Sequence, residues 1–132
     1  MKILKVLTLI IALSFLTIAC SSGGGSAVDT KSNPHSPPTS SITLSWNTPT
    51  ENTDGSPYTD SSGYRVYYNQ GTDPNNFTTQ YNFSDSAFIN RAYTESTISN
   101  LTVGTSWCFA VTAVDTSGNE SNLSTVICAT IS

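Results

Sequence analysis

The feature that most constrains the fold of this chain is an alternation of apolar and polar side chains with a period of two residues. In the clearest segment, Ile42, Leu44 and Trp46 alternate with polar residues. The alternation occurs in four segments, which are 42–47, 64–69, 107–113 and 123–129. Successive side chains of a β-strand point to opposite faces, so this pattern is typical of strands with one buried face. No segment shows helical spacing over the length that a helix needs.

These four segments predict most of an all-β domain. Shorter strands are expected near Phe77–Phe83 and Tyr93–Ser99, between the longer ones. Six or seven strands at this spacing within residues 40–132 indicate an antiparallel two-sheet sandwich. A segment of this length is large enough to bury a core of its own, so we expect one domain.

Two of the three cysteines are placed to form a disulfide. Cys108 and Cys128 lie at equal distances from Gly118, in a turn-rich stretch between strands expected at Ser106–Val114 and Asn122–Ile131. A hairpin centred on this glycine puts the two cysteines opposite each other, with Cβ atoms about 4.5 to 5.5 Å apart. That separation is close to what a disulfide requires, so we expect the bond. The alternative is a pair of buried free thiols.

The first 20 residues carry an export pattern. Lys2 and Lys5 precede an apolar run, Val6–Ala19, and Cys20 follows small residues. The run is shorter than the roughly 20 apolar residues of a membrane-spanning helix. The pattern resembles a bacterial lipoprotein signal, which implies a signal peptide at 1–19 and lipidation (acyl chains such as palmitate) of Cys20 as the first mature residue. The alternative is an ordinary secretory signal in which Cys20 is incidental.

That resemblance also implies a location and a domain order. The residue after the cysteine is Ser21, which in double-membrane bacteria directs lipoproteins to the outer membrane, whereas Asp retains them in the inner membrane. We therefore expect a protein of the cell envelope that is anchored to the membrane by its lipid. Residues 20–39 are rich in glycine, serine and proline and predict a tether, followed by the domain at 40–132.

The domain resembles a fibronectin type III domain, a sandwich of the immunoglobulin-like kind, over nearly all of its length. The resemblance is carried by Ile42–Trp46, Gly63–Tyr68 and Leu101–Ser121, which are similar to that family's strand B, strand C and strands F to G. It implies that Trp46 is the tryptophan between the sheets. Trp107 stands in the place of the family's corner tyrosine, and an indole donates but cannot accept a hydrogen bond. Little before residue 40 alternates, so the first strand is expected to be short or missing.

The charge balance excludes one class of partner. Without Lys2 and Lys5, three basic residues face nine acidic ones, a net charge of −6. The chain has no basic cluster and no basic-aromatic interleaving, which argues against nucleic-acid binding.

A candidate interaction face follows from strand parity. The outer side of the predicted C, F and G strands is less polar than an exposed sheet needs to be, and such a patch is typical of interaction sites. Its members are Arg65, Tyr67, Ala110, Thr112 and Val126, beside the two cysteines and Val114 and Ser124. The alternative is that Tyr67 covers the disulfide and the other residues pack on one another.

The loop Glu51–Asp60 is a weaker candidate site. Its carboxylates could join backbone carbonyls as hard oxygen ligands for calcium. However, Asp54-Gly55 and Ser56-Pro57 are ordinary turn residues, and the spacing matches no EF-hand loop.

We expect no catalysis and no cofactor. The only histidine, His35, lies in the predicted tether, and no nucleophile stands beside a base. Two function classes remain: a lipid-anchored interaction or spacer module that binds a protein partner, and a carbohydrate-binding accessory domain with a polysaccharide partner. Three coplanar exposed rings would favour the second class. The rings to examine are Tyr58, Phe77, Tyr81, Phe83 and Phe88.

Overall fold

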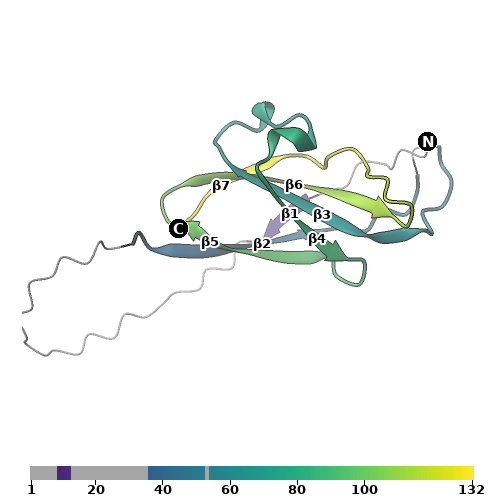
Figure 1. Ribbon diagram of the computed structural model, residues 1–132, viewed down its shortest axis with the longest axis horizontal. Helices are drawn as coiled ribbons and strands as arrows, with labels where there is room; N and C mark the ends of the chain where they lie inside the picture. The colour runs from purple at the N-terminus through teal and green to yellow at the C-terminus, as the bar shows by residue number, and fades with distance from the viewer. Residues whose placement is uncertain (1–8, 13–35, 53) are drawn as a thin grey trace, which may run out of the picture.

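The protein is an antiparallel β-sandwich, as the alternation predicts. A computed structural model describes residues 9–12, 36–52 and 54–132. One sheet has the order β1-β2-β5 and the other β4-β3-β6-β7 (Figure 1). The strands are β1 (Leu9–Ala12), β2 (Thr39–Trp46), β3 (Ser61–Gln70), β4 (Asp85–Asn90), β5 (Glu95–Thr102), β6 (Ser106–Asp115) and β7 (Ile127–Thr130). Two short 3-10 helices, η1 (Pro74–Asn76) and η2 (Gln80–Asn82), lie between β3 and β4.

The core lies between the two sheets and consists of the apolar faces that the alternation marks. At its centre the Trp46 ring meets the Tyr64 ring edge-on, with centroids 5.2 Å apart. This places Trp46 between the sheets, as the family resemblance implies. The buried cluster is Ile42, Leu44, Trp46, Tyr64, Val66, Ile98, Leu101, Phe109, Val111, Ala113 and Ile131.

At the corner that leads into β6, Trp107 takes the place of the tyrosine that the family resemblance implies. The Trp107 indole Nε1 donates to the Thr105 hydroxyl over 2.9 Å, and that hydroxyl donates to the Thr102 carbonyl over 2.6 Å. The indole only donates, and the Thr105 hydroxyl, which both accepts and donates, relays its hydrogen bond to the backbone. The corner bond is therefore altered rather than absent.

The β6–β7 hairpin forms the expected disulfide. Cys108 is paired with Cys128 in the ladder, and the two are bonded. The regular strand β7 is shorter than expected, however, because the chain between Ser121 and Val126 leaves the ladder. In this stretch the hydroxyl oxygens of Ser121 and Ser124 accept from the amides of Ala113 and Val111, so serine side chains replace backbone acceptors.

The strand expected at Phe77–Phe83 is absent, which corrects that prediction. The segment contains η2 and follows η1, whose first turn is capped by the Asp73 carboxylate accepting from the Asn75 amide over 2.9 Å. Proline at the first helical position favours this turn. The strand of this part of the chain is β4, which begins at Asp85.

The place of the doubtful first strand is taken by residues far upstream. Strand β1, within the predicted signal peptide, pairs antiparallel with β2 at the edge of the smaller sheet. Cys20 and most of the predicted tether lie outside the described residues. Among the residues that are described, no helix is long and apolar enough to cross a membrane.

Breaking the disulfide is expected to destabilise the domain without changing its topology. The change Cys128→Ala should lower the free energy of unfolding by about 3 kcal/mol, because the bond closes a loop between residues 20 apart in sequence. Urea denaturation measures this loss, with Ala129→Ser in the same strand as the control.

A thiol assay on the denatured, unreduced protein gives an independent check. In a Cys20→Ser background, the chain with both domain cysteines should show no reactive thiol, and the Cys128→Ala chain should show one. Reactive thiols in the former would contradict the bond.

Candidate interaction surface

The outer face of β3 and β6, predicted to be an exposed interaction face, is largely covered. Tyr67, Ala110 and Thr112 are buried, as are Cys108, Val114 and Ser124. Arg65 keeps 40% of its side chain exposed, and Val126 is half-buried. The expectation of an exposed apolar patch is therefore wrong, because two loops fold over this face. The structure instead matches one part of the alternative, because the long residues pack on one another, with Tyr67 against Phe83.

The first covering element is the segment between β3 and β4. The Phe83 ring packs against Tyr67 with centroids 5.9 Å apart, and against Phe77 at 4.8 Å. A Cβ at Gly71 would lie 2.8 Å from Phe77 and 3.7 Å from the Cys108 sulfur, so this ring fits close to the disulfide only because residue 71 is glycine.

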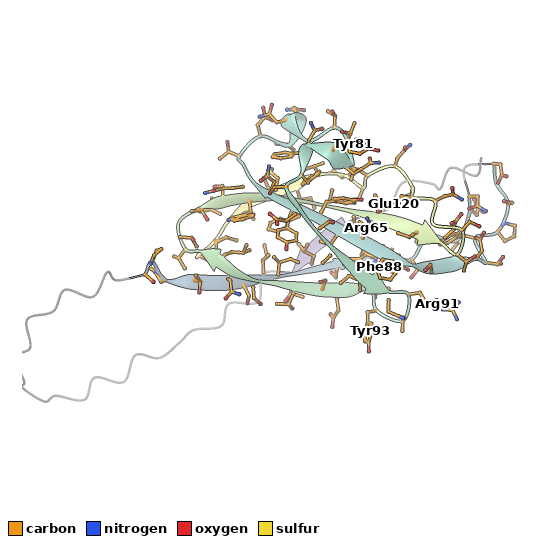
Figure 2. The ribbon with its side chains drawn as sticks, viewed as in Figure 1. Arg65, Tyr81, Phe88, Arg91, Tyr93 and Glu120 are labelled. Atoms are coloured by element: carbon orange, nitrogen blue, oxygen red, sulfur yellow. A yellow bond between two sulfur atoms is a disulfide. The ribbon has the colours of Figure 1, made fainter. Side chains whose placement is uncertain are left out.

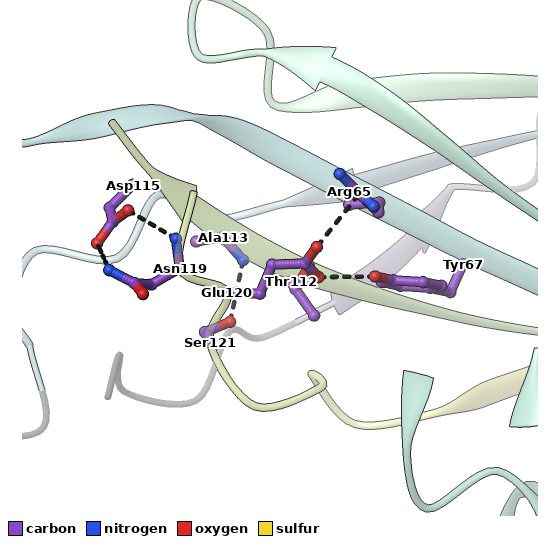
Figure 3. A network of polar contacts seen from close by, with 8 residues as sticks. All are labelled: Arg65, Tyr67, Thr112, Ala113, Asp115, Asn119, Glu120 and Ser121. Carbon is purple, nitrogen blue, oxygen red and sulfur yellow. Dashed lines mark hydrogen bonds and ion pairs between the residues drawn. The ribbon is translucent and has the colours of Figure 1, made fainter. Parts of the chain in front are cut away.

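The second covering element is the β6–β7 connection, which brings Glu120 onto the same face (Figure 3). One carboxylate oxygen of Glu120 accepts from the Tyr67 hydroxyl over 2.6 Å and from the Thr112 hydroxyl over 3.0 Å. Its other oxygen forms an ion pair with Arg65 Nε over 3.3 Å. The carboxylate is thus paired on both sides, as a charge on a side chain that is only 19% exposed requires.

The turn that positions Glu120 is built by Asp115. Its carboxylate accepts from the amides of Ser117 and Asn119, each over 2.8 Å, and from the Asn119 side chain. The hydrogen bond from that side chain, followed by the amides, lowers the pKa of Asp115. Gly118 closes the turn at φ 83°, a conformation that favours glycine.

The raised pKa of Tyr67 suits a structural role for this network. Burial, then the hydrogen bond and negative charge of Glu120, raise the pKa of Tyr67 to about 12. Tyr67 therefore stays protonated at ordinary pH and donates, which suits a link between β3 and the β6–β7 connection. A tyrosine that acts as an acid or base needs a pKa nearer to the working pH.

The exposed aromatic side chains lie elsewhere. Phe88 in β4 is 52% exposed, and Tyr93, in the turn between β4 and β5, is 62% exposed. The same turn carries Arg91, whose guanidinium donates to the Ser61 carbonyl over 3.4 Å. Phe88, Arg91 and Tyr93 lie around the β4–β5 hairpin, on the lower side of the view in Figure 2, and are called here the hairpin surface.

Phe88 is held in place by its strand. It is paired with Arg65 across the β3–β4 ladder. A Cβ at Gly63 would lie 2.7 Å from the Phe88 ring, so the ring rests over a residue without a side chain. An exposed ring that is braced by the backbone loses little conformational entropy when a partner binds it.

The five rings considered for carbohydrate binding do not form a platform. Phe77 is buried, Phe83 packs on Tyr67, and the Tyr58 hydroxyl donates to the Val114 carbonyl over 3.0 Å. Tyr81, which is 89% exposed, lies in η2 at the opposite side of the molecule from the hairpin surface (Figure 2).

The loop Glu51–Asp60 is organised by turn hydrogen bonds. The Asp54 carboxylate accepts from both the amide and the hydroxyl of Ser56, and the Asn52 side chain donates to the Pro57 carbonyl. Among the described residues, no group of three histidine, cysteine, aspartate or glutamate side chains is placed to hold a metal ion. The calcium hypothesis gains no support from this geometry.

Sequence reasoning missed Glu120, Arg91 and Tyr93 as members of these arrangements. The sequence does indicate Phe88 as a candidate ring, and strand parity assigns Arg65 and Tyr67 to the correct face of the sheet. The only local signal for Glu120 is its place two residues after Gly118, where a hairpin turn returns to its partner strand.

The Tyr67→Phe variant tests the covered face. It should lower the free energy of unfolding at neutral pH by roughly 1–3 kcal/mol, because the paired Glu120 carboxylate loses a donor.

The variant should also change the dependence on pH. The folded-state pKa of Tyr67 is raised to about 12, so its contribution is complete below the unfolded-state value of 10.0 and is lost as pH rises through 12. Urea denaturation from pH 9 to 12 should therefore show a shallower decline for Tyr67→Phe than for the wild type. The exposed-site control Tyr81→Phe should keep the steeper decline.

Comparison with known proteins gives one family and several similar structures. The family model described as fibronectin type III domain matches residues 33–129. A crystal structure of chicken CNTN1 FN1-FN3 domains is similar with a TM-score of 0.54 at 20% identity, over 70% of this chain and 27% of that one. The third fibronectin III domain of human KIAA0343 protein is similar with a TM-score of 0.51 at 13% identity, over 83% of this chain and 93% of that one. At these identities the structures show a shared fold alone. No curated protein matches the sequence.

Proposed function

This chain belongs to the fibronectin type III family, and from that premise we propose that it is a lipid-anchored module of the bacterial cell envelope that binds a protein partner through its hairpin surface. Domains of this family are commonly non-catalytic modules for binding or spacing. The observation that carries the proposal is the exposure of Phe88 and Tyr93 beside Arg91 in one hairpin.

The anchor is supported by the sequence around Cys20. Lys2 and Lys5, the apolar run to Ala19 and the small residues before Cys20 suit a lipoprotein signal. The disulfide uses the other two cysteines, so Cys20 is the one left for a lipid. Each buried methylene of an acyl chain contributes about 0.8 kcal/mol, so two or three chains hold a protein at a membrane.

The binding surface is supported by its chemistry. Aromatic residues and arginine are enriched at interfaces, where rings supply apolar area at low entropic cost. Arg91 is one of three basic residues after the predicted signal, in a chain with nine acidic residues. A partner with an apolar groove bordered by carboxylates fits this combination.

The carbohydrate-binding alternative has weaker support. Sugars stack on flat, exposed rings held side by side, and the five rings proposed for this role are buried, packed or dispersed. Tyr81 and Phe88 are the exposed rings among the five, and they lie on opposite sides of the molecule, which suits single contacts rather than a platform.

Lipidation is tested by metabolic labelling. Cells that produce the full chain are grown with radioactive palmitate, and the immunoprecipitated protein should carry the label. The Cys20→Ser variant should carry none, while Ser21→Asp should keep the label and move from the outer to the inner membrane on a density gradient. Equal label on wild type and Cys20→Ser would contradict the anchor.

Binding is tested by crosslinking in intact cells. The full-length protein should give a defined adduct, and Phe88→Ser or Tyr93→Ser should reduce its yield several-fold because each removes an exposed ring. Tyr81→Ser deletes an equally exposed ring at another site and is the matched control. An adduct that survives both hairpin changes, or falls equally with Tyr81→Ser, would move the interface elsewhere.

A further inference from the structure

Strands β3 and β4 place a single charged residue, Arg65, on the outer face of their sheet. Arg65 lies directly opposite Phe88 in the β3–β4 ladder, so the two side chains project to the same side. Asp85, the other charged residue of these strands, has the opposite parity to Phe88 and belongs to the other face. The cover over β3 and β6 does not extend this far, because 40% of the Arg65 side chain is exposed and Phe88 is 52% exposed.

The Phe88 ring lies between two arginines. A Cβ at Gly63 would be 2.7 Å from this ring, which places the ring two residues before Arg65 along β3. The guanidinium of Arg91 donates to the Ser61 carbonyl, two residues further back. Figure 2 shows Phe88 between Arg65 and Arg91. The order along β3 is therefore charge, ring and charge, at steps of two residues that span roughly 13 Å from Ser61 to Arg65.

The guanidinium of Arg65 is oriented by Glu120. Its Nε lies 3.3 Å from one Glu120 carboxylate oxygen. That carboxylate is itself held by the hydroxyls of Tyr67 and Thr112. An arginine presents its donors in a planar fork, so with Nε engaged its Nη groups are still able to bind a second carboxylate. A side chain held in this way loses little conformational entropy when a ligand binds.

Positive charge gathers around this ring in a chain that is otherwise acidic. Arg65 and Arg91 are two of the three basic residues after the predicted signal, against nine acidic residues. Among the charged side chains placed around the ring, which are Arg65, Arg91 and Glu120, the balance is positive. A partner that lays an apolar side chain on Phe88 therefore gains from carboxylates on both sides of that side chain.

We propose that Arg65, Phe88 and Arg91 bind an extended acidic segment of the partner protein. An apolar residue of the segment lies on Phe88, and acidic residues two positions before and after it meet the arginines. Side chains two residues apart share one face of an extended segment, and their spacing equals that of the three groups along β3. This inference rests on the proposed function, because it needs a protein partner at the hairpin surface, and it adds Arg65 to that surface. It does not depend on the lipid anchor.

A second copy of this chain does not supply such a segment. No two of its nine acidic residues lie four positions apart. The chain therefore contains no apolar residue with an acidic residue two positions before it and another two positions after it. The proposed occupant is accordingly a different protein.

The probe is a fluorescent synthetic peptide, Gly-Ser-Glu-Ser-Leu-Ser-Glu-Ser-Gly. In one control peptide both glutamates are replaced by glutamine, and in a second the leucine is replaced by serine. Binding to the full chain, extracted in detergent, is measured by fluorescence anisotropy. The wild type should bind the first peptide more tightly than either control by about five-fold or more, and added salt should weaken this binding because it screens exposed charges.

Variants of the two arginines locate the site. Arg65→Gln and Arg91→Gln should each weaken binding of the acidic peptide by about five-fold or more. Arg65→Lys should weaken it less, because lysine keeps the charge but not the planar fork. Lys31→Gln removes the same charge from the predicted tether and should leave the affinity unchanged. Thermal melts verify the fold, and Arg91→Gln changes an exposed side chain, so it tests the site even if Arg65→Gln does not fold.

Equal affinity for the acidic and the amide peptides, or equal affinity of the wild type and the two glutamine variants, would overturn the proposal. Crosslinking in cells separates that failure from a failure of the proposed function. If the adduct depends on Phe88 but on neither arginine, the hairpin surface binds a partner of another chemistry and the acidic segment is wrong. If the adduct does not depend on Phe88 or Tyr93, the proposed function fails, and the peptide titrations still decide whether an acidic segment binds at Arg65.

Discussion

Strand β6 is buried on both faces, and the rest of the structure depends on this. Its inward residues Phe109, Val111 and Ala113 form the core, while outward Cys108, Ala110 and Thr112 are as fully excluded from solvent. A two-sheet sandwich normally buries only one face of each sheet. The second face needs a cover of its own, which explains the disulfide, the phenylalanine pair and the Glu120 network. The large aromatic side chains that stay exposed lie instead outside this face of β6, among them Phe88 and Tyr93 of the hairpin surface.

Much of this architecture could be predicted from local pattern. Alternation identified the residues of β2, β3 and β6 that face the core, and the symmetry of two cysteines about Gly118 placed them opposite each other. Both inferences use only the period of a strand and the geometry of a hairpin, which are local properties. The family resemblance placed Trp46 in the core, and the structure adds the threonine that serves the corner tryptophan.

The covered face could not be predicted in the same way. Parity assigns a side chain to a face of a sheet but contains no information on what lies over that face. Tyr67 and Glu120 are 53 residues apart in the sequence, and the turn after β6 that carries Glu120 has no periodicity. Aromatic residues such as Phe77 and Phe83 are typical of strands. In the structure, however, both lie outside the strands, and their rings pack against each other. The error at the predicted interaction face and the missing strand thus have one cause, which is tertiary packing of aperiodic segments.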